Sequence, residues 1–371
     1  LLPTNDCNMR CVYCSVGVGT ADQSTMSPEA CDAALRYQAG VVRREGYRHL
    51  SVNLFGGEPF FARPIVGQCA QHGRRLADSL GVPFVFTAGT NAFMSAEYAA
   101  WVAENLSGLL VSLDGPPDIQ NMQRPAVGGG PTYDVVARNI AIFEDKGLPY
   151  SLRCTVSEKD TCRIPEIMEH FCGCFSPERI NFEPLLVTGD RRNKTLSPSH
   201  AQDFVSAIVK AGVVARQHGI PIKLNTARPE CIERSNCRVA QDHFVVAPDG
   251  LVAACYDANH RGSPCASEYA LGAYDPSFDE IVIDQERVER LRQYGVENIP
   301  RCNGCFCKWH CAGGCRLYHT PPFCTDPPNA LCLMTQRLTV WRLLTDMGLY
   351  GEADSISLEA GEVREFSHAA V

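Results

Sequence analysis

Three cysteines near the start of the chain stand at a spacing that could hold an iron–sulfur cluster. They are Cys7, Cys11 and Cys14, with thiols at positions i, i+4 and i+7. The same spacing would place three small apolar side chains on one helix face, but the stretch also contains Asn8 and Arg10. Cysteine thiolates hold iron–sulfur clusters, usually four per cluster. Three local thiolates would leave one iron open for a substrate or cofactor.

A glycine-rich run and two polar motifs follow the next apolar stretches. Residues 49–55 are followed by Gly56, Gly57, Glu58 and Pro59. Residues 83–88 are followed by Thr90 and Asn91. Ser112 lies at the end of the run 108–113, and Arg124 stands twelve residues after it. A Gly-Gly pair alone is typical of a tight turn. A carboxylate that only accepts hydrogen bonds also suits an ammonium ligand, and an arginine can hold a carboxylate through two parallel hydrogen bonds.

Eight further cysteines crowd the last part of the chain. They are Cys231, Cys237, Cys255, Cys302, Cys305, Cys311, Cys315 and Cys332. A Cys-x2-Cys pair with a second pair of thiols suits one tetrahedral zinc ion, so a zinc ribbon is an alternative. Eight cysteines at this spacing exceed the need of one zinc ion.

The elements that must position these residues alternate between two kinds. Apolar, β-branched runs cover residues 49–55, 83–88, 108–113, 150–156 and 179–187, and residues 1–4 could add a strand. Helical patterns cover residues 28–45, 63–80, 96–105, 133–146 and 197–218. This alternation is typical of βα units around a parallel sheet, so we expect an α/β fold. In a βα barrel the loops after the strands share one rim, which would bring the motifs together.

The N-terminal motifs resemble those of the radical S-adenosylmethionine (SAM) enzymes, which carry Cys-x3-Cys-x2-Cys with an aromatic residue, here Tyr13, before the third cysteine. The resemblance implies a partial (β/α)6 TIM-like barrel. It also implies a 4Fe–4S cluster that binds SAM at its open iron and cleaves it to methionine and a 5′-deoxyadenosyl radical. The SAM-contacting residues carried over are Tyr13, Gly56, Gly57, Glu58, Pro59, Asn91, Ser112 and Arg124. Ala92 departs from the pattern, because relatives often carry glycine there.

The C-terminal array resembles the SPASM domain, which follows radical SAM cores that modify peptides and proteins and carries two auxiliary 4Fe–4S clusters. Carried over by position, Cys231, Cys237, Cys255 and Cys315 would hold the first auxiliary cluster, and Cys302, Cys305, Cys311 and Cys332 the second. We therefore expect a radical SAM core over residues 1–225, a SPASM domain over residues 226–340, and a C-terminal helix and tail over residues 341–371.

A catalytic base is expected directly after the third cysteine of the first auxiliary set. In sulfatase-maturating relatives an Asp holds that position and takes a proton from the substrate. Here Tyr256 stands there and Asp257 follows. A shift of one residue in a strand turns a side chain to the opposite face. Both residues remain candidates, with a solvated loop as the alternative, and the displacement argues against a sulfatase maturase.

Composition limits the partners and the compartment. The net charge of −8 argues against a nucleic-acid partner, and no apolar run is long enough to span a membrane. Twenty cysteines in 371 residues favour metal chemistry in a reducing, cytoplasmic compartment, because disulfide scaffolds are usually far shorter. The chain opens on Leu1, so we expect a missing N-terminus, and the sequence does not show whether a leader-peptide-binding domain precedes it.

The motifs together predict a radical SAM/SPASM enzyme with three 4Fe–4S clusters and an external one-electron reductant of the flavodoxin or ferredoxin type. It would abstract hydrogen from a peptide or protein side chain. The favoured function is cross-linking or oxidation of a ribosomally synthesised peptide. Formation of formylglycine in a sulfatase is the first alternative, and dehydrogenation of a small molecule is the second. A non-catalytic iron–sulfur electron carrier would require the open iron and Glu58 to be accidental.

Overall fold

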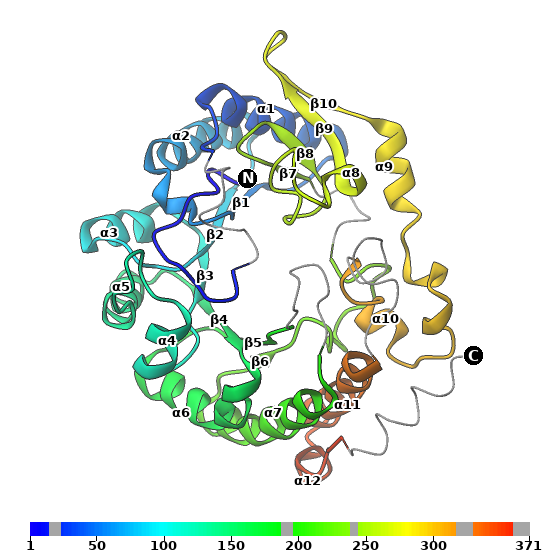
Figure 1. Ribbon diagram of the computed structural model, residues 1–371. Helices are drawn as coiled ribbons and strands as arrows, with labels where there is room; N and C mark the ends of the chain where they lie inside the picture. Colours follow the sequence, from blue (N-terminus) through cyan, green and yellow to red (C-terminus); the bar gives the residue numbers. More distant parts are fainter. Residues whose placement is uncertain (15–23, 187–195, 238–243, 317–328, 359–371) are drawn as a thin grey trace. The chain divides into compact units, whose positions relative to one another are not determined.

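A sheet of six strands forms the larger β-structure of the protein, whose computed structural model describes residues 1–14, 24–186, 196–237, 244–316 and 329–358. Along the sheet the order is β1 (Leu50–Leu54), β2 (Phe84–Thr90), β3 (Gly108–Ser112), β4 (Tyr150–Val156), β5 (Ile180–Pro184) and β6 (Ile222–Lys223). The pairs β1–β2, β2–β3, β4–β5 and β5–β6 are parallel. The expected α/β class with a six-stranded parallel sheet is confirmed (Figure 1).

Helices follow most strands, and several begin at capping residues visible in the sequence. Ser27 accepts a hydrogen bond from the Ala30 amide at 3.1 Å, and Pro28 opens the helix behind it. The α-helices are α1 (Pro28–Glu45), α2 (Arg63–Leu80), α3 (Ala96–Asn105), α4 (Pro117–Gln123), α5 (Tyr133–Asp145), α6 (Ile164–Cys174), α7 (Pro198–His218), α8 (Ala266–Tyr269), α9 (Gln285–Arg292), α10 (Lys308–Cys311), α11 (Asn329–Asp346) and α12 (Tyr350–Asp354). Short 3-10 helices are η1 (Pro59–Phe61), η2 (Glu158–Arg163), η4 (Val296–Asn298) and η5 (Pro300–Cys302).

The sixth strand is not the one expected. Residues 1–4 lie beside β1, where the Phe55 amide donates to the Leu1 carbonyl at 3.0 Å, but they form no strand. The two-residue strand β6 completes the sheet instead, after helix α7. A strand this short leaves no alternation in the sequence from which it could be predicted. The expected strand 179–187 ends at Pro184, and residue 187 lies outside the described residues.

The chain folds as two compact units that do not follow sequence order. The first contains Leu1–Leu113, Gln120–Ser151 and Arg238–Arg292, and the second contains Asp114–Ile119, Leu152–Cys237 and Gln293–Val371. The first therefore holds all predicted SAM-contacting residues and both candidate bases. The division into domains at residues 225, 340 and 371 stays a prediction.

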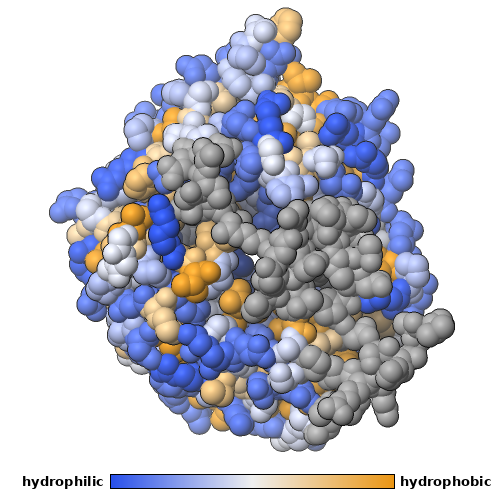
Figure 2. Space-filling model, viewed as in Figure 1, coloured by the Kyte–Doolittle hydropathy of each residue, from blue (hydrophilic) through white to orange (hydrophobic). Residues whose placement is uncertain are grey.

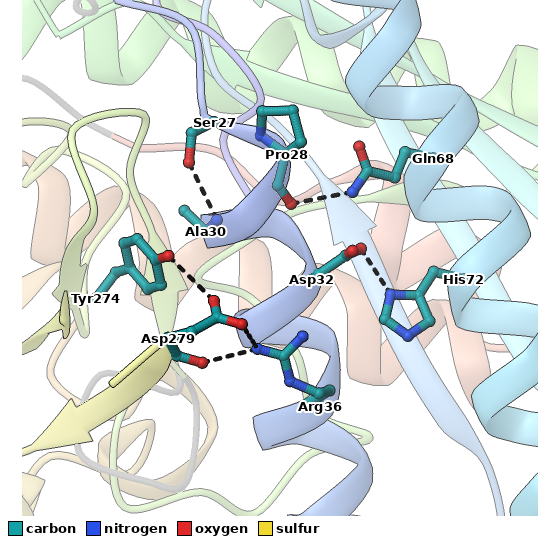
Figure 3. Close-up of polar contacts among 9 residues, drawn as sticks. All are labelled: Ser27, Pro28, Ala30, Asp32, Arg36, Gln68, His72, Tyr274 and Asp279. Atoms are coloured by element: carbon teal, nitrogen blue, oxygen red, sulfur yellow. Dashed lines mark hydrogen bonds and ion pairs between the residues drawn. The ribbon is translucent and has the colours of Figure 1, made fainter. Parts of the chain in front are cut away.

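A second sheet in the first unit is antiparallel, in the order β10-β9-β8-β7, and its strands are β7 (Val245–Val246), β8 (Leu251–Ala253), β9 (Ala270–Asp275) and β10 (Glu280–Ile283). Its β9–β10 hairpin is tied to α1, because Arg36 donates to the carbonyl and carboxylate of Asp279 at 2.7 and 2.8 Å (Figure 3). On the other side of α1, Asp32 contacts His72 of α2 at 2.6 Å. These contacts fix α1 between the hairpin and α2.

The face shown in Figure 2 is largely hydrophilic, with apolar residues in scattered positions. Among the described residues, none of the helices combines the length and the apolar character that a membrane crossing requires.

One glycine governs the packing of α11, which carries Cys332, against α7. A Cβ atom at Gly212 would lie 2.5 Å from a ring carbon of Trp341. We expect Gly212→Ala to lower the free energy of unfolding by about 1–3 kcal/mol, because the helices must move apart. The control Gly40→Ala, on α1 with no atom within 4 Å of the new methyl, should raise it by about 0.5–1 kcal/mol. Denaturant unfolding measures both, and equal stability of the two variants would contradict the packing.

Candidate active site

The segment that carries Cys7, Cys11 and Cys14 is bonded along its length to a second loop. Three backbone hydrogen bonds of 2.8 to 3.0 Å join residues 8–12 to residues 123–127. The three thiols lie within electrostatic range of one another, since Cys11 and Cys14 both raise the pKa of Cys7. The structure therefore brings the predicted cluster ligands together.

The Gly-Gly pair after β1 lies directly against the chain that leads into Cys7. The Gly57 amide donates to the Thr4 carbonyl at 3.0 Å, and the Glu58 amide donates to the Asp6 carbonyl at 2.8 Å. A Cβ atom on Gly57 would stand 2.2 Å from the Asp6 oxygen, and one on Gly56 would stand 2.5 Å from the Thr4 oxygen. Only glycine permits this approach, so the pair does more than turn the chain.

Glu58 is a buried carboxylate that joins two loops. One oxygen accepts from the Thr90 hydroxyl at 2.8 Å and from the Phe60 amide at 3.2 Å, and the other accepts from the Asn91 amide at 2.7 Å. Desolvation raises the pKa of Glu58 to about 7, although these hydrogen bonds oppose the shift. The carboxylate thus fixes the loop after β2 against the loop after β1. Pro59 is buried and opens the short helix η1 directly behind it.

Asn91 links this network to the cysteines. Its side-chain amide donates to the sulfur of Cys7 at 3.6 Å and to the side-chain oxygen of Asn8 at 2.9 Å. The Met9 amide also donates to the Cys7 sulfur, at 3.4 Å. Hydrogen bonds to cysteine sulfurs are among the factors that set the potential of an iron–sulfur cluster, so Asn91 is positioned to tune a cluster held by Cys7. Its predicted contact with SAM stays a prediction.

Arg124 contacts both the sulfur of Cys11 and the ring of Tyr13. A terminal nitrogen of Arg124 donates to the sulfur of Cys11 at 3.8 Å, and its guanidinium lies 5.3 Å from the centre of the Tyr13 ring. Ser112 ends β3 and is half-buried, and no described side chain bonds to its hydroxyl. Its predicted contact with SAM stays a prediction.

Ala92 and Asn139 complete the loop after β2. Ala92 is buried with φ at +53°, a left-handed conformation that explains the glycine of relatives at this position. Asn139 of α5, also fully buried, donates to the carbonyls of Ala92 and Met94 at 2.8 and 2.9 Å. The sequence analysis missed Asn139, whose signal is a polar residue at an apolar position of the helical pattern.

The donors around Cys7, Cys11 and Cys14 fit a 4Fe–4S cluster with one open iron. Burial, and next the charge of Glu58, raise the pKa of Cys7 to about 12, so a bound cation is needed to ionise it. A thiol that coordinates a metal is deprotonated. Among the described residues, no three His, Cys, Asp or Glu side chains are close enough for a single metal ion.

The four cysteines of the second auxiliary set all belong to the second unit. Burial, and next the charges of Cys332, Cys302 and Cys305, raise the pKa of Cys311 to about 12. Their grouping around one cluster stays a prediction. Buried Cys307 is a neighbour that competes for assignment, and its hydrogen bond lowers the pKa of Cys305 to about 6.

The four cysteines of the first auxiliary set are distributed over both compact units. Cys255 belongs to the first unit, whereas Cys231, Cys237 and Cys315 belong to the second, and their grouping stays a prediction. Of the nine cysteines without a predicted role, five are buried, as expected for small apolar side chains: Cys31, Cys69, Cys154, Cys265 and Cys307. Cys162, Cys172 and Cys174 are at least partly exposed, and Cys324 lies outside the described residues.

Tyr256 is held beside the loop that follows β1. Its hydroxyl accepts from the side-chain amide of Asn53 at 3.3 Å, and its ring lies 5.0 Å from that of Phe55, the residue before Gly56. Burial raises the pKa of Tyr256 above its ordinary value of 10, so the phenol stays protonated at neutral pH. Tyr256 can therefore position or donate. The half-buried carboxylate of Asp257 is the group of the two that can accept a proton.

Comparison with known proteins agrees with this arrangement. Residues 1–169 match the family model of the Radical SAM superfamily. The chain is 24% identical over 332 residues to a cysteine-type anaerobic sulfatase-maturating enzyme of Clostridium perfringens (strain 13), covering 84% of this chain and 86% of the relative.

Two solved structures share the fold. Native anSMEcpe with bound AdoMet and the Kp18Cys peptide has a TM-score of 0.74 at 18% identity, covering 95% of this chain and 99% of that one. Streptococcus suis SuiB bound to the precursor peptide SuiA has a TM-score of 0.59 at 16% identity, covering 85% and 71%. The expected radical SAM domain is thus recognised in residues 1–169, and the expected fold class is confirmed.

Substitution of Gly57 tests the contact with the cysteine segment. We expect Gly57→Ala to lose about four irons per chain and to abolish SAM binding, because the new methyl would meet two carbonyl oxygens of residues 5 and 6 within 2.6 Å. Gly67→Ala on α2, where nothing lies within 4 Å, should retain both. Iron analysis and calorimetry of anaerobically reconstituted protein decide it, and a Gly57→Ala protein with full iron and SAM affinity would rule out the close approach.

Iron content also tests the two auxiliary sets. One three-thiol and two four-thiol sites correspond to about twelve irons per chain if each holds 4Fe–4S. Joint replacement of Cys7, Cys11 and Cys14 by Ala should remove about four irons and all SAM cleavage, while the remaining irons stay bound. Unsubstituted protein with only about four irons, or with mostly zinc, would contradict the two auxiliary clusters.

Proposed function

We propose that this radical SAM enzyme oxidises a peptide, removing two hydrogens to form a cross-link or an unsaturated side chain. The proposal is carried by the position of Tyr256, whose ring contacts Phe55 immediately before the Gly-Gly-Glu run. The segment after Cys255 therefore stands at the loop that is to hold SAM. The anSMEcpe and SuiB structures with bound peptides support a peptide as the substrate class.

The residues of this chain have separate tasks in that reaction. When bound, the cluster and SAM supply a 5′-deoxyadenosyl radical by one-electron reduction. Arg124, Asn91 and the backbone of residues 56–58 hold and orient SAM. One hydrogen atom of the substrate leaves in 5′-deoxyadenosine, and Asp257 accepts one proton. An auxiliary cluster, if held by the C-terminal cysteines, would take up the remaining electron. Tyr256, neutral and anchored by Asn53, orients the substrate.

Formylglycine formation in a sulfatase is the second candidate. It is favoured by the similarity to the Clostridium perfringens enzyme over 84% of this chain. It is disfavoured by the neutral phenol of Tyr256 at the position of the expected base. A protonated phenol with a raised pKa takes up no proton at neutral pH, so the proton acceptor must lie elsewhere.

Mass spectrometry of two peptides separates these functions. We expect a precursor peptide encoded beside this gene to become about 2 Da lighter, the mass of two hydrogens, and a Cys-type sulfatase peptide to remain unchanged. Conversion of the sulfatase peptide to formylglycine, about 18 Da lighter, would establish the second candidate. Formation of 5′-deoxyadenosine in both reactions controls for an active radical site.

Two substitutions separate the roles of Asp257 and Tyr256. We expect Asp257→Asn to lower product formation by about 10²-fold or more, as for loss of a general base, while 5′-deoxyadenosine still forms. Tyr256→Phe should raise KM for the peptide and leave the pH profile between 6 and 9 unchanged, because the native phenol stays protonated there. Full product formation by Asp257→Asn would exclude Asp257 as the base.

A further inference from the structure

Three neighbouring strands of the second unit carry charged side chains on one face. Arg153 of β4 stands opposite Asn181 of β5, and Asn181 stands opposite Lys223 of β6. Glu183 lies two residues further along β5 and therefore points to the same face. The alternate residues are apolar and almost fully buried: Leu152, Cys154, Ile180, Phe182 and Ile222. Helices α6 and α7 cover that apolar side (Figure 1), so the charged face is the inner face of these strands.

The charges on this inner face are close but not paired. Desolvation raises the pKa of Glu183 to about 7, and the positive charges of Arg153 and Lys223 partly oppose it. Yet among the described residues no ion pair or hydrogen bond joins the three side chains, and the buried Nε of Arg153 has no partner there. With Glu183 ionised the three half-buried side chains carry a net charge of +1, and charges removed from water are normally paired.

The radical site described above does not include Arg153, Glu183 or Lys223. The predicted SAM contacts and the cysteines of the radical cluster belong to the first unit, whereas Arg153, Glu183 and Lys223 belong to the second. Apolar side chains on these strands would cost less to bury than charges. Their presence on the face of the sheet away from α6 and α7 leaves a net positive charge that an anionic ligand can neutralise.

We propose that Arg153 and Lys223 form a carboxylate-binding subsite that anchors an acidic group of the substrate, with Glu183 and Asn181 beside it. A guanidinium offers two parallel donors that match a carboxylate, and a single carboxylate neutralises the net charge of +1, which a phosphate dianion would overshoot. The proposal rests on the peptide-modifying function, and it selects peptides that carry a carboxylate.

Two sources can supply this carboxylate: an Asp or Glu side chain, or the free C-terminus of a peptide. Three probes distinguish them, namely N-acetyl-Ala-Glu-Ala-amide, N-acetyl-Ala-Ala-Ala with a free C-terminus, and the neutral N-acetyl-Ala-Gln-Ala-amide. We expect calorimetry with the anaerobically reconstituted holoenzyme and SAM to show binding of at least one acidic probe and weaker or no binding of the neutral one.

Substitutions then locate the binding. Arg153→Met and Lys223→Met should each weaken the acidic probe about ten- to a hundredfold, in keeping with the loss of hydrogen bonds to a charged group. The matched control Lys210→Met, on the exposed side of α7, should not change it. If circular dichroism shows that Arg153→Met does not fold, Arg153→Lys, which retains the charge, replaces it in the binding test. Equal binding of the neutral probe, absence of binding by both acidic probes, or unchanged affinity in Arg153→Met and Lys223→Met would overturn the subsite.

Two further measurements test the subsite independently of the proposed peptide-modifying function. The affinity for SAM should be equal in all variants, which excludes the carboxylate of SAM as the ligand. The 5′-deoxyadenosine formed without peptide should also be equal. Loss of that product in the unsubstituted enzyme would refute the radical function, while the calorimetric result would still decide the subsite.

Discussion

The backbone contact between residues 56–58 and residues 4–6 is the constraint on which the radical site depends. Two hydrogen bonds make the contact, and Gly56 and Gly57 permit it because neither has a Cβ atom. A chain of hydrogen bonds connects this contact to the cysteines. The Glu58 carboxylate accepts from the backbone amide of Asn91 in the loop after β2, and the side chain of Asn91 donates to the sulfur of Cys7. The positions of the cluster ligands are thus set by backbone geometry, which a single methyl group on Gly57 would disturb.

The same contact concentrates negative charge in a buried place. Glu58, Cys11 and Cys14 lie within electrostatic range of Cys7, and their negative charges add to burial in raising the pKa of Cys7. Arg124, the side-chain amide of Asn91 and the backbone amide of Met9 donate hydrogen bonds to these sulfurs. This arrangement disfavours ionisation of the Cys7 thiol by itself and favours a bound cation. The folding of the loop and the loading of its cluster are therefore coupled.

The residues of the site that could be predicted from the sequence are those that belong to a local pattern. Motifs at the ends of predicted strands meet in the structure, as Glu58, Asn91 and the cysteines show, because parallel strands place their following loops at one edge. It did not find β6, since two residues carry no periodicity. It also missed Asn139, whose partners lie 45 and 47 residues away, and the interleaving of the two units, which assigns Cys255 to the first unit and Cys231, Cys237 and Cys315 to the second. These depend on long-range contacts that no window of sequence contains.

Two departures from the family pattern have different physical weight, and the difference bears on function. Ala92 adopts the left-handed backbone that glycine would adopt more easily, at a cost of about 1–2 kcal/mol. The hydrogen bonds from Asn139 offset that cost, so the loop and its chemistry are preserved. Tyr256 instead replaces an acceptor by a phenol that stays protonated, which changes what the site can do with a proton. A chain that retains the radical-generating loops but alters the base position conserves the abstraction of hydrogen and changes the fate of the substrate. This argument favours a peptide oxidation other than formylglycine formation.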